Sequence, residues 1–411
     1  MIKNGRENAN EMAGKLLLFI IAPFLSFLYS LKSLKSRSTY LIFILFNLLF
    51  GLNFTVTNDR SAEHNLDGSL YRGVFENYCL GVYSSLSAKW DAYLGFDEET
   101  SKDIYVDIIS FIVSRFTSNY HILFLVYAIV FTFFMAHSLK YLLKSKNFKN
   151  GSWVCFFLFI LFIYNDIFNI NGVRFWTAAW VAVYALFRIY VDKKKVYFAL
   201  ICITPLIHAS YILFVLVSAI AVFFNEVAPR LKYLLLVSIF LSPLMVVALQ
   251  SIDVSSMPAF FGRYMELYAS EEALDAYGEK NASTLYYIIK TLFSVVSLLY
   301  INFLVLKIVR FSKTDLSAKP FSNFLVIFAV FCNLTMIIPS VGGRYIVLCY
   351  PIIAYLWLNV IGISQLSNWI KVLPLFFLLT FRSKLLQYTL VLDSDFYYMN
   401  LFSLIFKNLQ Q

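Results

Sequence analysis

Apolar and polar positions alternate along this chain in long blocks rather than residue by residue. A helix needs about 20 apolar residues to cross the hydrocarbon core of a bilayer. A transmembrane barrel would instead show short segments of alternating polarity, which residues 122–136 do not show. The pattern predicts an all-α, polytopic transmembrane helix bundle of about 11–12 spans. The apolar blocks lie near 15–30, 39–57, 119–139, 152–168, 174–191, 196–207, 209–224, 231–250, 284–306, 321–339, 344–363 and 369–381.

Two connections between the apolar blocks are long, residues 58–118 and 251–283. In the first, apolar residues recur at helical spacing over 104–116, beside Asp103 and Asp107. This spacing predicts an amphipathic helix on the outer membrane surface. No strong internal repeat divides the chain, so we expect residues 1–411 to form one integral membrane domain.

The two ends of the chain follow the block pattern less clearly. Residues 15–30 have basic residues on both sides, so both a span and an interfacial segment are compatible with their sequence. Residues 385–406 are patchily apolar and contain Asp393 and Asp395. This composition favours a segment that lies on the surface over a span.

The basic residues orient the expected bundle. Only 14% of the residues are charged, against about 25% in a typical soluble protein, although the net charge is +10. The positive charge falls in alternate short connections, as the positive-inside rule requires of cytoplasmic loops, and therefore indicates topology rather than a nucleic-acid partner. Both long loops are acidic and are expected on the periplasmic side. The basic clusters are Lys32, Lys35 and Arg37; Lys140, Lys144, Lys146 and Lys149; Arg188, Lys193, Lys194 and Lys195; Arg230 and Lys232; and Lys307, Arg310, Lys313 and Lys319.

The motifs of soluble enzymes are missing from the sequence. It contains no P-loop, dinucleotide-binding fingerprint, HExxH or CxxC. With four histidines it offers little basis for a metal site, so we expect neither a metal nor a cofactor. The remaining candidates are ionisable residues near the outer ends of apolar helices, where charge is expensive and a function is the default hypothesis.

Two arginines begin helices at expected outer turns. Arg174 follows the turn at 169–173 (NINGV), and Arg344 follows Gly342 and Gly343. A helix N-terminus already favours an anion, and a guanidinium group offers bidentate donors to phosphate oxygens. The pair predicts a diphosphate-binding site. The structural alternative is that each arginine reaches toward lipid head groups.

His208 and Lys290 are expected near the same surface. His208 ends the short block 196–207, in which Pro205 predicts a broken or half-crossing helix. This histidine is the candidate general base, and a backbone-bonded histidine in an irregular turn is the alternative. Lys290 lies about two helical turns inside the block 284–306. A charge at that depth should face the protein interior and a partner, here the diphosphate.

Weaker candidates accompany these four residues. Asp166 and Glu266 are alternative general bases, and Arg263 is a further diphosphate ligand. The candidate contacts for the sugars of a substrate are Asp59, Arg60, Asn171 and Tyr345.

These residues, in this order, resemble the EpsG-like and Wzy-type polymerases of bacterial surface polysaccharides. The resemblance covers most of the chain. Its most specific part is the spacing from Asn-Gly-Val-Arg174, through a basic turn, to a short helix that ends in His208-Ala-Ser. Late in the chain, Arg344-Tyr345 opens another helix, as in the family.

Two positions depart from the family pattern. Gly51-Leu52-Asn53 occurs where relatives carry an arginine after the second helix, and Phe175 occurs where they carry a glutamine. Arg60 and Arg72 are candidates to replace the missing arginine.

The resemblance implies a GT-C-like, inverting glycosyltransferase of the bacterial inner membrane. Such an enzyme transfers the growing glycan from undecaprenyl diphosphate to a new lipid-linked repeat unit at the periplasmic face, without a cofactor. A flippase and a chain-length regulator are its implied partners. The alternatives are an O-antigen ligase and a flippase for lipid-linked oligosaccharides. The modest loop 251–283 argues against the ligase, and charge gathered at one face argues against the flippase.

Overall fold

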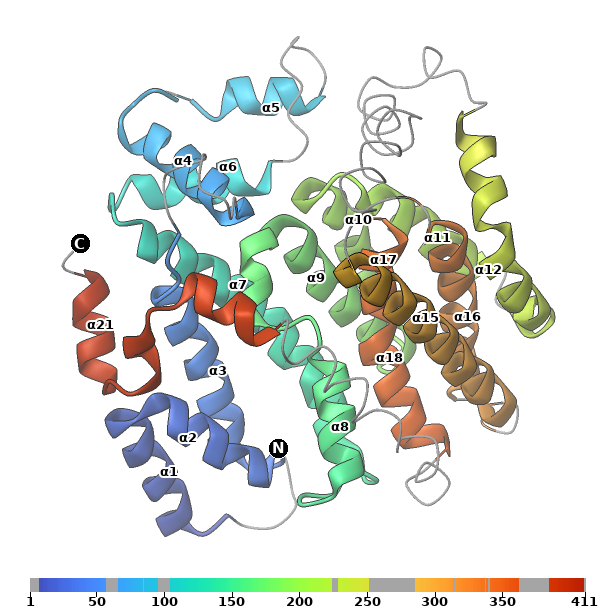
Figure 1. The fold of residues 1–411 in the computed structure, drawn as a ribbon, viewed down its shortest axis with the longest axis horizontal. Coiled ribbons are helices and arrows are strands. Elements are labelled where there is room, and N and C mark those ends of the chain that lie inside the picture. The colour runs from blue at the N-terminus through green and yellow to red at the C-terminus, as the bar shows by residue number, and fades with distance from the viewer. Residues whose placement is uncertain are drawn as a thin grey trace.

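The computed structural model describes residues 7–56, 66–83, 85–94, 104–223, 228–250, 285–312, 315, 317–336, 338, 341–361 and 384–409. Within these ranges every regular element is a helix (Figure 1), which confirms the predicted all-α class for this part of the chain. The apolar block 369–381 and the long connection 251–283 lie outside the described residues.

The helices follow the apolar blocks closely in the first two thirds of the chain. In order they are α1 (Ala9–Ile21), α2 (Pro23–Ser30), α3 (Arg37–Leu52), α4 (Asp67–Cys79), α5 (Ser87–Leu94), α6 (Tyr105–Ser114), α7 (Tyr120–Lys144), α8 (Trp153–Phe162), η2 (Ile167–Gly172), α9 (Val173–Tyr190), α10 (Phe198–Ile207), α11 (Tyr211–Phe223), α12 (Ala228–Gln250), α15 (Leu285–Ser312), α16 (Lys319–Leu334), α17 (Gly342–Tyr345), α18 (Cys349–Leu356), η6 (Trp357–Ile361), η7 (Ser394–Tyr397) and α21 (Leu401–Leu409).

Four helical segments are long and apolar enough to cross a bilayer. Several other apolar blocks form helices of only 10–17 residues, so the described residues contain fewer full-length spans than the expected number of about 11–12. Blocks 39–57, 196–207, 209–224 and 321–339 form helices of 16, 10, 13 and 16 residues, whereas α12 covers block 231–250 with 23 residues. The four segments are Tyr120–Lys144, Trp153–Tyr190, Val295–Ser312 and Gly342–Ile361.

The first apolar block forms a helical hairpin. Pro23 separates α1 from α2 because proline lacks the N–H that would continue a helix, and Ser26 Oγ of α2 donates to the carbonyl of Lys15 at 2.8 Å. The Lys15 ammonium is buried and donates to Glu7 at 2.8 Å and to the hydroxyl of Ser33, beyond α2, at 2.7 Å. The hairpin therefore returns to the side on which it begins and does not span.

The basic turns meet at one end of the bundle, called here the basic end. Lys35 Nζ donates to the carbonyls of Ser145 and Phe148 at 3.0 and 3.1 Å, which joins the first two basic turns. Lys193 Nζ donates to the carbonyl of Ser317 at 3.3 Å, which joins two later ones. The Tyr141 hydroxyl donates to Asp192 at 2.5 Å and joins the two pairs, so these four basic turns lie at the same end of the bundle.

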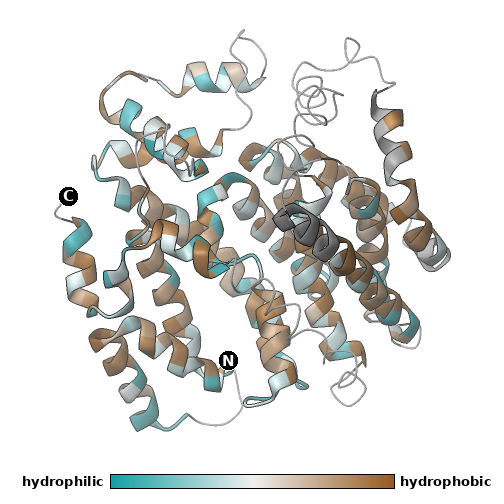
Figure 2. Ribbon diagram, viewed as in Figure 1, coloured by the Kyte–Doolittle hydropathy of each residue, from teal (hydrophilic) through white to brown (hydrophobic). Residues whose placement is uncertain are grey.

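The first long connection folds into a cap of three helices, α4, α5 and α6, at the opposite end. Figure 1 shows these helices above the bundle, and α1 and α2 below it. Helix α6 lies within residues 104–116, where the sequence predicted a helix. Figure 2 shows hydrophobic residues along the bundle helices and more hydrophilic residues in the cap.

The C-terminal segment packs beside α3 in short helices. The Thr55 N–H donates to the carbonyl of Val391 at 2.8 Å, and the Asn408 amide donates to Asn53 Oδ1 at 2.7 Å. Neither residues 384–391 nor α21 is long enough to cross a bilayer. An apolar groove of about 420 Å³ lies where α21 approaches α1 and α3, and its lining includes Leu16, Phe19, Leu401 and Ile405.

Candidate functional site

Arg174 lies at the start of α9, directly beneath the cap. Its Nε donates to the Tyr71 hydroxyl of α4 at 3.4 Å, and its guanidinium carbon is 5.5 Å from the centre of the same ring. An arginine close to an aromatic face is stabilised by the quadrupole of the ring. A Cβ on the preceding Gly172 would lie 3.1 Å from the Trp176 side chain, so a larger residue there would require that ring to shift.

Phe175 brings the sequence-predicted residues together. The centre of its ring is 5.3 Å from the imidazole of His208 and 5.3 Å from the ring of Tyr345. The guanidinium carbon of Arg344 is 5.7 Å from the same ring. Three distant parts of the sequence therefore meet at the start of α9. We call this group the Phe175 cluster; it consists of Arg174, Phe175, His208, Ser210, Arg344 and Tyr345.

The hydrogen bonds of His208 assign its tautomer. The backbone N–H of Ser210 donates to His208 Nδ1 at 3.3 Å, and Ser210 Oγ is 2.8 Å from the same nitrogen. Because Nδ1 accepts the hydrogen bond from this backbone N–H, the proton of the neutral ring is assigned to Nε2. The Tyr345 hydroxyl is 3.0 Å from Ser210 Oγ. The hydroxyls of Tyr345 and Ser210 thus form a chain that ends at His208 Nδ1.

The cluster can bind an anion. Arg174 and Arg344 supply permanent positive charge and planar donors, and the neutral His208 supplies an N–H at Nε2. Both arginines and the histidine are half-buried, which strengthens their electrostatic interactions relative to bulk water. Phe175 contacts both His208 and Arg344, and the adjacent Arg174 contacts Tyr71 of the cap.

Asp166 takes a different place in the fold. Its carboxylate pairs with Lys384 at 2.9 Å, and it accepts the backbone N–H of Phe168 at 3.2 Å as the N-cap of η2. These contacts join η2 to the C-terminal segment, and none of them involves the Phe175 cluster. The described geometry therefore favours a structural role for Asp166.

Asn171 and Tyr345, predicted as substrate contacts, hold the site in place. Asn171 Oδ1 accepts the Gly68 N–H at 2.9 Å, near the N-terminus of α4, which fixes the cap to η2. Tyr345 is fully buried and reaches Ser210. Asn171 therefore positions the cap, and the buried Tyr345 positions Ser210.

Arg72, a candidate to replace the family's missing arginine, anchors α4. It pairs with Glu76 at 2.7 Å, donates to the carbonyl of Val56 at 2.8 Å and lies 3.9 Å from the ring centre of Tyr120. With these contacts, its guanidinium group holds the cap to the bundle.

Several predicted site residues are not described. Lys290 belongs to α15, but its side chain is outside the described residues. Four others also lie outside them: Asp59, Arg60, Arg263 and Glu266.

Asp107 of α6 is a charged residue that the sequence did not indicate as a site residue. Tyr78 Oη of α4 donates to its carboxylate at 3.1 Å. Burial raises the pKa of Asp107 above its ordinary value, although Tyr78, Lys89 and Arg174 each act in the opposite direction. The sequence indicated Asp107 only as the polar edge of an amphipathic helix, because nothing in it shows that α4 covers that edge.

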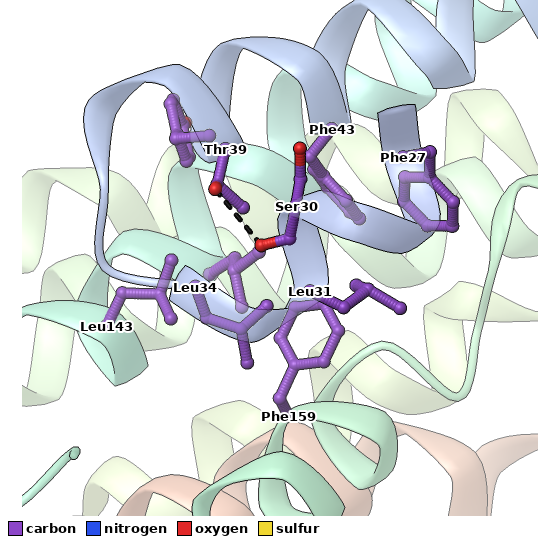
Figure 3. Close-up of a pocket in the computed structure, with 10 residues that line it drawn as sticks. Phe27, Ser30, Leu31, Leu34, Thr39, Phe43, Leu143 and Phe159 are labelled. Carbon is purple, nitrogen blue, oxygen red and sulfur yellow. Dashed lines mark hydrogen bonds between the residues drawn. The ribbon is translucent and has the colours of Figure 1, made fainter. Parts of the chain in front are cut away.

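No metal site is found within the described ranges, where no three His, Cys, Asp or Glu side chains gather. Figure 3 shows a cavity near the basic end, between α2 and α3, that is lined by Phe27, Ser30, Thr39 and Phe159 among others. Its volume of about 10 Å³ suits at most one water molecule. It is too small to admit a sugar or a lipid.

The fold and the site together define a broad class: an all-helical protein with several helices long and apolar enough to cross a membrane. No protein-family model, curated protein or solved structure matches the chain. Any narrower assignment rests on the chemistry of the Phe175 cluster.

Proposed function

We propose that this chain is a bacterial surface-polysaccharide polymerase, a GT-C-like inverting glycosyltransferase of the inner membrane. It would transfer the glycan carried by undecaprenyl diphosphate onto a new lipid-linked repeat unit. The observation that carries the proposal is the convergence of His208 and Arg344 on Phe175, next to Arg174 at the start of α9. These are the residues that resemble the functional positions of the polymerase family.

The cluster suits the leaving group of this reaction. When the bond from the sugar to the diphosphate breaks, negative charge grows on the bridging oxygen. Preorganised donors aimed at growing charge are a large contribution to catalysis. Arg174 and Arg344 would bind the diphosphate, and His208 would donate from Nε2, because its Nδ1 accepts from Ser210. In this proposal His208 is a diphosphate ligand rather than the general base.

The position of the cluster agrees with the location of the substrate. The cluster lies at the end of α9 opposite Arg188 and the basic end, and positive loops face the cytoplasm in inner-membrane proteins. This arrangement supports a periplasmic location for the cluster in the proposed enzyme. Lipid-linked repeat units reach that side after a flippase has moved them, and no nucleotide sugar is needed there.

The glycan length distribution in cells tests this proposal. A strain of the source bacterium that lacks the protein would be complemented with Arg174→Ala, His208→Ala or Arg344→Ala, with protein levels matched by immunoblot. We expect each variant to lower polymer at least about 100-fold, because removing one oxyanion donor typically costs this much in rate, and to leave single-repeat glycan. Arg174→Lys should restore little polymer, since an ammonium group lacks the planar, bidentate donors of a guanidinium group.

Arg115→Ala is the matched control. Arg115 is also on the cap side of the protein and lies 4.4 Å from the ring centre of Phe111, but it is exposed and outside the cluster. Wild-type chain lengths are expected for this variant. Wild-type lengths from all three cluster variants would overturn the site. Loss of all outward glycan would indicate a flippase, and full-length glycan that is not attached to its acceptor would indicate a ligase.

A further inference from the structure

We infer that Asp107 of the cap is the general base that removes the proton from the acceptor hydroxyl in this transfer. The inference rests on the proposed function and extends it, because the Phe175 cluster supplies donors for the leaving group but no carboxylate. Asp107 belongs to α6, a helix of the cap, and lies on the cap side of Arg174.

One face of α4 holds both Asp107 and Arg174. Tyr71 accepts a hydrogen bond from Arg174, and Tyr78 donates one to Asp107. The two tyrosines are seven residues apart, which is two helical turns or about 10 Å along the same face. One rigid element therefore holds the carboxylate and the guanidinium group on the same face, about two helical turns apart along α4.

Helix α6 is also fixed to the segment that carries His208. The Ile104 N–H, at the start of α6, donates to the carbonyl of Leu206 at 3.3 Å. Asp107 follows Ile104 by three residues and so lies on the same side of α6. Asp107 is thus connected to two elements of the site. Tyr78 and α4 connect it to the start of α9, and Ile104 connects its helix to the end of α10.

The surroundings of Asp107 make it a stronger base than an ordinary aspartate. Burial raises the pKa of Asp107, while Tyr78 of α4, Lys89 of α5 and Arg174 of α9 limit the rise. Tyr127 of α7 also faces it. A raised pKa brings a carboxylate closer to the pH at which a periplasmic enzyme works, which improves proton transfer.

The step balances without any further reactant. The acceptor hydroxyl transfers its proton to the Asp107 carboxylate as its oxygen forms a bond to the anomeric carbon of the donor glycan. The bond from that carbon to the diphosphate oxygen breaks, and its electron pair leaves with undecaprenyl diphosphate, which Arg174, Arg344 and His208 bind. Attack from the opposite side inverts the anomeric carbon. The proton on Asp107 then passes to solvent.

Asp107→Asn is the central test variant. The amide oxygen still accepts from Tyr78, and the charge that burial disfavours is removed, so the cap is expected to fold as before. The full chain in lipid nanodiscs would be given lipid-linked repeat units extracted from a strain that lacks this protein. We expect kcat to fall about 100-fold or more, the usual contribution of a general base. Binding of undecaprenyl diphosphate should change less than twofold.

Tyr78→Phe distinguishes a general base at position 107 from a residue that only anchors the cap. It removes the hydroxyl that donates to Asp107 but keeps the carboxylate. A base predicts substantial remaining activity, with the acidic limb of the pH–rate profile moved to higher pH, since the lost hydrogen bond had lowered the pKa of Asp107. Asp107→Glu should restore part of the rate lost in Asp107→Asn. If Tyr78→Phe is as inactive as Asp107→Asn, or if Asp107→Asn loses diphosphate binding, Asp107 only anchors the cap and the inference is wrong.

The wild-type protein separates failure of this inference from failure of the proposed function. Wild-type protein that extends no lipid-linked units would refute the polymerase itself. Wild-type protein that does extend them, together with an Asp107→Asn variant within threefold of its rate, would refute only the role of Asp107.

Discussion

The two ends of the helix bundle use positive charge in different ways. At the basic end, cations bind groups that belong to the fold: Lys35 donates to two backbone carbonyls, and Arg188 pairs with Asp192 at 2.5 Å and with the Tyr197 hydroxyl at 2.7 Å. At the opposite end, Arg174 and Arg344 are placed against the rings of Tyr71 and Phe175.

The difference separates charges that hold the protein together from charges that are positioned for a ligand. A carbonyl or a carboxylate satisfies the donors of a cation. Arg188 also lies 4.4 Å from the ring centre of Tyr197, so contact with an aromatic face is common to both ends, and Arg188 differs by its pairing with the Asp192 carboxylate. Substitutions at the basic end should therefore affect stability first, and substitutions in the Phe175 cluster should affect activity first.

The largest expected effect is at the glycine turn that introduces Arg344. A Cβ on Gly342 would lie 2.5 Å from Met336 Cα and 2.6 Å from the carbonyl carbon of Thr335, both of them backbone atoms. Gly342→Ala should lower the free energy of unfolding by about 3 kcal/mol, at the upper end for overpacking. It should also displace Arg344 and abolish polymer formation. SDS denaturation in mixed micelles and glycan length would measure the two effects.

The adjacent glycine is the control for this prediction. A Cβ on Gly343 meets nothing within 4 Å, so Gly343→Ala should leave stability within about 0.5 kcal/mol of wild type. Equal behaviour of the two alanine variants would show that the turn does not position Arg344.

A smaller effect, on stability alone, is expected at the basic end. Arg188→Ala removes charge-assisted hydrogen bonds to Asp192 and Tyr197. It should cost about 2 kcal/mol, since bonds to charged groups contribute about 1.5–3 kcal/mol each and this pair is partly exposed. The specific activity of the protein that remains folded should be unchanged in the nanodisc assay. Lost activity at full stability would contradict the division between the two ends.

The smallest effect on stability is expected at Ser210, which lies between His208 and Tyr345. Ser210→Ala removes the hydroxyl between His208 and Tyr345 but keeps the backbone N–H that donates to Nδ1. Stability should fall by about 1 kcal/mol, the net value of a typical hydrogen bond. Nitrogen NMR of labelled histidine should still find the proton of the neutral ring on Nε2. A shift to the Nδ1–H tautomer in this variant, or its presence in the wild type, would return His208 to the role of a base.

Much of this architecture could be predicted from the sequence because it depends on local pattern. The apolar blocks gave most helices of the bundle, and the loop charges indicated that the basic turns share one end. The amphipathic spacing gave α6, and the glycine turns located Arg174 and Arg344 at helix starts. Each of these features can be read within a window of about 20 residues.

The features that could not be predicted from the sequence depend on contacts between segments that are far apart in the chain. Helix α4 was not predicted, since its buried residues Tyr71, Phe75 and Tyr78 are interleaved with polar ones. The burial of Asp107 and the pairing of Asp166 with Lys384 both require a neighbour far along the chain. The lengths of the spans also differed, because proline and short turns divide apolar blocks that hydropathy treats as continuous.

The N-terminal hairpin has a consequence for the order in which the protein is assembled. Leu16 and Phe19 of α1 share an apolar groove with Leu401 and Ile405 of α21. A ribosome completes α1 hundreds of residues before it makes α21, so this flank of the hairpin stays uncovered until α21 has been made. Docking of α21 therefore comes late in the assembly of these helices. A nascent chain stalled before residue 400 should present that flank of α1 to lipid or to an insertion chaperone.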